Sequence, residues 1–113
     1  MLAPIIKNVR LASTWKPAGS RQGTLFCSLE EFAKRVGSPH VKDFSKDGID
    51  GAGKVHAAWT IDTPRGPVEI HDYWWNPSNQ LSIGASDSRA ALWCRAWLRL
   101  HGFRCSPEIR PDN

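Results

Sequence analysis

Two alternating stretches joined by a short turn constrain this chain more than any other feature. Apolar residues recur at every second position from Val55 to Ile61, and the alternation resumes at Val68 and continues to Trp74. The segment between them, residues 63–67, contains two prolines and a glycine, a composition typical of a tight turn. The pattern predicts an antiparallel hairpin, because side chains of a strand alternate between two faces.

The position of the turn also predicts the register of this hairpin. With the turn centred on residues 64 and 65, the core-facing residues form three opposed pairs: Ile61 with Val68, Trp59 with Ile70, and Ala57 with Asp72. The other face is then expected to carry His56, Glu69, His71 and Tyr73.

A short helix is predicted over residues 29–36. Ser28 and Glu31 have the spacing of a capping box, apolar residues follow at helical intervals, and Gly37 supplies the stop. The polar stretch at 16–23 is expected to be a loop. Further strands are predicted over 5–12, 24–27, 80–84 and 103–109.

A longer helix is predicted near the C-terminus, with Ser86 or Asp87 as its N-cap and Gly102 after its end. Half of its surface is mainly apolar and is expected to pack on the sheet; it carries Ala90, Trp93, Cys94, Trp97, Leu98, Leu100 and His101. Arg95 and Arg99 lie together on the opposite side.

These elements predict one α+β domain spanning residues 1–113, a length that suits a single domain. We expect a small, mainly antiparallel sheet of three to five strands packed against the long C-terminal helix and the short helix. Residues 38–54 are rich in Gly, Asp, Ser and Lys and predict a mobile surface loop. A polar tail is expected from about residue 106.

The chain is basic, with a formal net charge of +4 at pH 7. The excess lies at its two ends: residues 1–28 contain no acid, and arginines gather in and after the last predicted helix. Such a balance favours an acidic partner, either nucleic acid or an acidic protein surface.

The cysteines indicate a reducing compartment. Cys27, Cys94 and Cys105 are odd in number and lack C-x-x-C spacing, although a Cys94–Cys105 bridge is an alternative. Cys27 precedes a helix, where a thiol can be activated, but no histidine is near it in sequence. We see no secretory leader and no apolar run approaching the roughly 18 residues of a membrane span, so we expect a cytoplasmic protein without membrane contact.

One cluster could suggest metal or acid–base chemistry: His56, His71 and Asp72. The register puts both histidines on one face and Asp72 on the other, so the three cannot bind one ion without a bulge. In the structural interpretation, the histidines pair with Glu69 and Tyr73 while Asp72 accepts hydrogen bonds from loop backbone. We therefore expect no catalytic residue, no metal and no cofactor, with His56 and His71 as the only candidate ligands.

A basic and aromatic surface is the better candidate for function. Neighbours on a strand point to opposite faces, so one of Trp74 and Trp75 should lie outside the core unless a helix covers it. An exposed tryptophan beside arginine is typical of a protein interface, and it can also bind nucleic acid. The alternative is that the arginines pair with nearby acidic side chains and form an ordinary solvated face. The predicted binding residues are Lys16, Arg21, Trp74, Trp75, Arg89, Arg95, Arg99 and Arg104.

The run V-x3-W-x-I-x-T-P-x-G-P-V-x-I-x-D-Y over residues 55–73, followed by Ser82-Ile83-Gly84 and a final helix, resembles a pattern in small accessory proteins of bacteriophages and prophages. Gly37-x-Pro39 before the variable loop also fits, and the resemblance covers residues 29–100. It implies a phage-borne gene, a class that includes inhibitors of host defence such as anti-CRISPR proteins. It brings no active-site residue, and the basic charge departs from acidic DNA mimics.

Three hypotheses follow. The first is a non-enzymatic phage or prophage protein, active in the host bacterial cytoplasm, that inhibits a CRISPR-Cas type defence protein or ribonucleoprotein complex by direct contact. The alternative is a small basic accessory protein that binds nucleic acid. The third is a hydrolase or nuclease that uses His56, His71 and Asp72.

Overall fold

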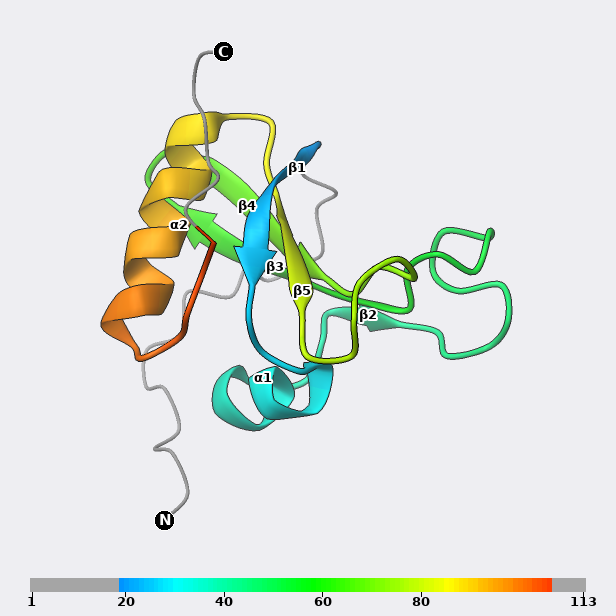
Figure 1. Cartoon of the computed structure of the whole chain (residues 1–113). Coiled ribbons are helices and arrows are strands. Elements are labelled where there is room, and N and C mark those ends of the chain that lie inside the picture. The colour runs from blue at the N-terminus through cyan, green and yellow to red at the C-terminus, as the bar shows by residue number, and fades with distance from the viewer. Residues whose placement is uncertain (1–18, 107–113) are drawn as a thin grey trace.

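A computed structural model describes residues 19–106, and in this range a five-stranded antiparallel sheet carries a helix on one face and a second helix at its end (Figure 1). The order across the sheet is β1-β5-β4-β3-β2. The α+β class and the C-terminal helix packed on the sheet are confirmed. The elements are β1 (Arg21–Leu25), α1 (Leu29–Val36), β2 (Val41–Lys42), β3 (Ala57–Thr63), β4 (Gly66–His71), β5 (Leu81–Gly84) and α2 (Ser88–Leu100).

The central hairpin, β3 with β4, has the register that its turn predicts. Trp59 lies opposite Ile70, and Ile61 lies opposite Val68. The hydroxyl of Thr63 holds the turn, because it donates to the Gly66 carbonyl at 2.7 Å and accepts the N–H of Arg65 at 3.1 Å. The strand predicted over 80–84 is β5, which pairs with β4.

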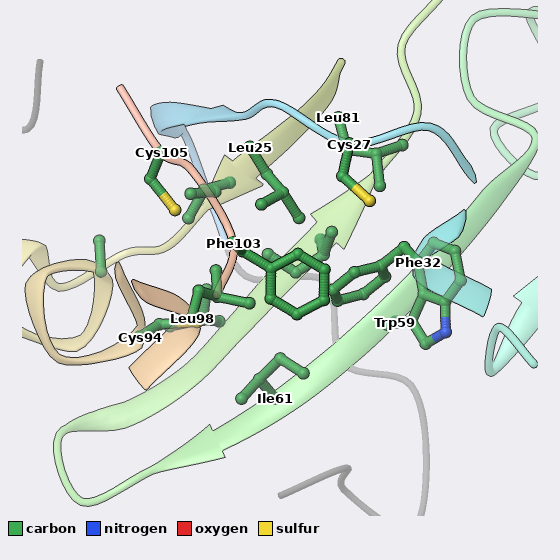
Figure 2. Packing of buried hydrophobic residues seen from close by; sticks show 14 of the residues in the cluster. Leu25, Cys27, Phe32, Trp59, Ile61, Leu81, Cys94, Leu98, Phe103 and Cys105 are labelled. Carbon is green, nitrogen blue, oxygen red and sulfur yellow. The ribbon is translucent and has the colours of Figure 1, made fainter. Parts of the chain in front are cut away.

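The core lies between the sheet, α2 and α1, and its largest buried side chain is Trp59 (Figure 2). The ring of Trp59 meets Phe32 of α1 edge-on, with centroids 4.8 Å apart. Its Nε1 donates to the carbonyl of Gly37 at 2.9 Å. One side chain therefore joins the middle of the sheet to both the side and the end of α1.

The capping signals place both helices. The Oγ of Ser28 accepts the N–H of Glu31 at 3.1 Å, and α1 ends before Gly37, as expected. Of the two N-cap candidates for α2, Asp87 is the cap, since its carboxylate accepts the N–H of Arg89 at 2.8 Å. Neither helix in this part of the chain is long and apolar enough to cross a membrane.

The buried stripe of α2 is narrower than its apolar half. The side chains that face the sheet are mostly small: Ala90, Ala91, Cys94 and Leu98. Trp93 and Trp97 lie half-buried at the margin, and Leu100, which was expected to pack on the sheet, is 82% exposed. These small residues let α2 approach the sheet closely, so the contact between them is narrow and the bulkier side chains of α2 lie at its margin or outside it.

The two ends of the described range differ from the sequence expectation. β1 starts at Arg21, so the predicted loop at 16–23 is wrong at its last residues. After α2 the chain returns to the sheet, where Cys105 forms an isolated antiparallel β-bridge with Leu25 and the N–H of Ser106 donates to the Thr24 carbonyl at 2.8 Å. This returning chain covers the outer edge of β1. The predicted strand at 5–12 and the tail from residue 107 lie outside the described residues.

The 38–54 segment contains structure that its composition does not predict. Val41 and Lys42 form β2 at the edge of the sheet. Further along, the Oδ1 atom of Asp50 accepts the backbone N–H groups of Ala52, Lys54 and Val55 at 3.2–3.4 Å. Hydrogen bonds to Asp50 thus hold part of the backbone of this loop. The mobility of the loop stays a prediction.

Replacing Trp59 by phenylalanine should lower the free energy of unfolding by about 1–3 kcal/mol, because the smaller ring leaves a gap beside Phe32 and removes the donor to the Gly37 carbonyl. Urea denaturation followed by far-UV circular dichroism measures the change. Trp75→Phe is the matched control, since Trp75 is 73% exposed, and should shift the value by less than about 0.5 kcal/mol. Equal stability of Trp59→Phe and the unaltered protein would contradict this role.

Candidate functional site

Three large aromatic side chains are exposed on two segments that meet at the end of β4, and we call them the aromatic patch: Phe44, Trp74 and Trp75. Their exposed fractions are 62%, 55% and 73%. Trp74 and Trp75 meet edge-on with ring centroids 4.9 Å apart. The N–H of Trp74 donates to the carbonyl of Lys54 at 2.7 Å, which ties the segment after β4 to the loop that carries Phe44.

The sequence predicted one exposed tryptophan at this pair, and the structure exposes both. The reason is that β4 ends at His71, so Trp74 and Trp75 lie in a turn, where side chains no longer alternate between the two faces of a sheet. The alternative that helices cover both rings is wrong. Sequence reasoning missed Phe44, although an aromatic residue in an otherwise polar loop was a signal for it.

The base of the aromatic patch is held by Asp72. Its Oδ1 atom accepts the backbone N–H groups of His56 and Ala57, both at 2.8 Å. The Nδ1 atom of His56 lies 3.5 Å from Oδ2 of Asp72, and the His56 ring stacks in parallel on Phe44. Asp72 therefore binds loop backbone, as the structural interpretation expected. Its predicted separation from His56 is wrong, because His56 precedes β3 and its side chain is not confined to one face.

His71 occupies a different environment. Its Nδ1 atom lies 3.2 Å from a carboxylate oxygen of Glu69, and its ring meets Tyr73 edge-on. The structure thus gives the two histidines separate carboxylate partners instead of joining them with Asp72. Within residues 19–106, no group of three or more His, Cys, Asp or Glu side chains is placed to hold a metal ion.

The predicted basic surface is divided among internal contacts. Arg89 pairs with the capping carboxylate of Asp87 at 3.2 Å, and this contact lowers the pKa of Asp87. Arg95 donates to the Ser106 carbonyl at 3.0 Å. Arg99 donates to the carbonyl of Cys105, and the guanidinium of Arg104 lies over the ring of Phe26. These arginines fasten α2 and the returning chain as well as facing solvent.

Arg21 lies apart from those arginines. It is opposite Gly84 in the sheet, so it belongs to the face that points away from the core and α2. There it donates a hydrogen bond to the hydroxyl of Thr24. Lys16 lies outside the described residues. The predicted basic residues therefore do not form one continuous surface.

The three cysteines are free thiols, and all are buried. Burial raises the pKa of Cys27 to about 11 and that of Cys105 to about 11, and it raises the pKa of Cys94 still further. Cys94 and Cys105 enter the same part of the core from α2 and from the returning chain (Figure 2). A raised pKa removes the thiolate that a nucleophile needs, so this structure does not activate Cys27.

We expect iodoacetamide at pH 8 to modify the three cysteines slowly in the folded protein and completely after unfolding in urea, because both burial and the raised pKa suppress the reactive thiolate. Mass spectrometry of timed samples gives the extent of labelling. Rapid modification of Cys27 in the folded protein would restore it as a candidate nucleophile.

α2 carries a second apolar surface. Its outer side bounds a shallow cleft of about 350 Å³ that is lined by Trp93, Ala96, Trp97 and Leu100. The aromatic patch differs in that a backbone hydrogen bond, from Trp74 to Lys54, joins the two segments that carry its rings. Comparison of the chain with protein-family models, curated proteins and solved structures found no match.

Proposed function

We propose that this is a non-enzymatic phage or prophage protein that inhibits a CRISPR-Cas type defence complex by direct protein contact through the aromatic patch. The observation that carries the proposal is the joint exposure of Trp74 and Trp75, with Phe44 exposed on the adjoining loop. The phage context is supported by the resemblance of the hairpin run over residues 55–73.

A protein partner suits these rings because buried tryptophans often dominate the energy of protein interfaces. Leaving three large aromatic side chains in water is unfavourable unless a partner covers them. The two tryptophans are also positioned before binding, since the backbone N–H of Trp74 donates to the Lys54 carbonyl and its ring packs edge-on against Trp75. Preorganisation lowers the entropic cost of association.

The loop around Phe44 adds a rim of mixed charge. Hydrogen bonds from Ser45 lower the pKa of Asp43, and backbone N–H groups lower that of Asp50, so both carboxylates are anionic at neutral pH. Lys42, Lys46 and Lys54 alternate with the acids along this segment. An apolar centre with a polar rim of both signs is the usual composition of a protein interface.

The alternative is nucleic-acid binding, and the exposed rings beside Lys54 are what favours it. Bases stack on aromatic side chains, and a positive groove normally follows the phosphates. The acids around Phe44 weaken that interpretation, as do the internal contacts of Arg95 and Arg99. The two functions differ in their dependence on salt.

The double substitution Trp74→Ala with Trp75→Ala should abolish inhibition. We expect the unaltered protein to restore phage plating on bacteria that carry a CRISPR-Cas system with a matching spacer, and the double variant to lose at least about thirtyfold of that effect, the equivalent of about 2 kcal/mol. Plating efficiency on a panel of system types is the measurement.

Leu100→Ala is the control, because it removes an even more exposed apolar side chain from α2 and should leave plating unchanged. The proposal fails if the unaltered protein restores plating on no system type in the panel. It also fails if the double variant, shown to be folded by circular dichroism, inhibits as well as the unaltered protein.

Charge reversal at Arg95 and Arg99 distinguishes nucleic-acid binding from protein binding. If the target is a protein bound by the aromatic patch, Arg95→Glu with Arg99→Glu, once shown to be folded by circular dichroism, should preserve inhibition. Labelled single-stranded or duplex oligonucleotides should then bind only above micromolar concentrations. Fluorescence anisotropy at 50 and 200 mM salt tests this. Tight binding that falls steeply with salt and disappears in the variant would replace the first proposal with the second.

A further inference from the structure

The sheet face away from α2 holds a cleft of about 330 Å³, and none of the three residues of the aromatic patch lines it. It is lined by Gly19, Arg21, His71, Tyr73 and Ser82. The sheet register brings these residues together, because His71 lies opposite Ser82, and Arg21 lies opposite the neighbouring Gly84. Three strands, β1, β4 and β5, therefore supply polar groups to one hollow.

Two glycines let the backbone pack closely beside this hollow. A side chain at Gly84 would place its Cβ 3.3 Å from the Gly19 carbonyl oxygen and 3.7 Å from Cε1 of His71. A Cβ at Gly19 would lie 2.9 Å from the backbone nitrogen of Ser86, and the φ of +93° at Gly19 disfavours other residues. Because Gly84 has no side chain, the space beside His71 stays free.

The polar groups around the cleft are oriented by buried partners. The Nδ1 atom of His71 lies 3.2 Å from Oε1 of Glu69, and both side chains are largely buried. Asn76 donates to the Ser82 hydroxyl at 2.9 Å, which leaves the proton of that hydroxyl to be donated elsewhere. Arg21 uses one guanidinium nitrogen on Thr24 and has further donors for a ligand. Buried polar groups on a sheet face are costly unless they are paired or bind something.

We propose that this cleft binds the phosphate group of a small phosphomonoester. Arg21 supplies the charge and several donors, and the hydroxyls of Ser82 and Tyr73 supply two more. The Nδ1 atom of His71 faces Glu69, so it is the protonated form of the imidazole that can donate to the ligand through Nε2. Donors that arrive from three strands fit the tetrahedral acceptors of phosphate better than the planar acceptors of a carboxylate. The volume suits a small molecule, because it lies at the lower end of ligand pockets.

Isothermal titration calorimetry with phenyl phosphate tests this site in the full chain, with benzoate as the planar anion of similar size and sodium chloride as the control for ionic strength. We expect phenyl phosphate to bind and Arg21→Gln to weaken it at least about tenfold, since a charge-assisted contact is lost. Arg65→Gln, which removes the same charge from the exposed β3–β4 turn, should leave binding unchanged. Tyr73→Phe should weaken binding about threefold and replaces the Arg21 variant as the test if that variant fails to fold.

Absence of phenyl phosphate binding at millimolar concentration overturns the proposal. Equal losses in Arg21→Gln and Arg65→Gln also overturn it, because they would indicate attraction by net charge alone. Benzoate binding as tight as phenyl phosphate overturns the choice of phosphate. The double variant of Trp74 and Trp75 should bind phenyl phosphate normally, so failure of this site is distinguishable from failure of the protein-binding proposal.

Discussion

The contact between Trp59 and α1 is the interaction on which the rest of this structure depends. Trp59 lies in the central hairpin, packs edge-on against Phe32 and donates to the Gly37 carbonyl. It fixes where α1 ends and where the chain departs towards β2 and the Phe44 loop. Because β3 and β4 sit in the middle of the sheet, every other strand is positioned from this hairpin, directly or through a neighbour.

Sequence patterns predicted the parts of the fold that local chemistry specifies. The alternation and the turn at residues 63–67 specified the β3–β4 register, and the caps at Ser28 and Asp87 placed the helices. The extent of burial on α2 was not predictable from periodicity, because the small residues that contact the sheet set the width of the interface. β2 and the first residues of β1 have weak local signals and form by pairing with strands distant in sequence.

The candidate site was predictable only in part, for a related reason. Composition pointed to Trp74 and Trp75, but their joint exposure depends on where β4 ends. Net charge pointed to a basic surface, yet Arg95 and Arg99 donate to the returning chain and Arg21 lies on another face. A sequence counts charges but does not show which of them the fold uses as internal donors. The polar cleft shows the same limit, because its residues come from three strands.

The hydroxyl of Thr63 closes the turn at one end of the hairpin, while the aromatic patch lies at the other, open end. The patch is divided between the chain entering β3 and the chain leaving β4, and the Trp74 to Lys54 hydrogen bond spans the two. A slip of two residues would keep all apolar side chains inward but shift the two halves of the patch by about 7 Å. The β3–β4 turn therefore sets the register of the hairpin, and through it the relative position of the two segments that carry the exposed rings at the far end.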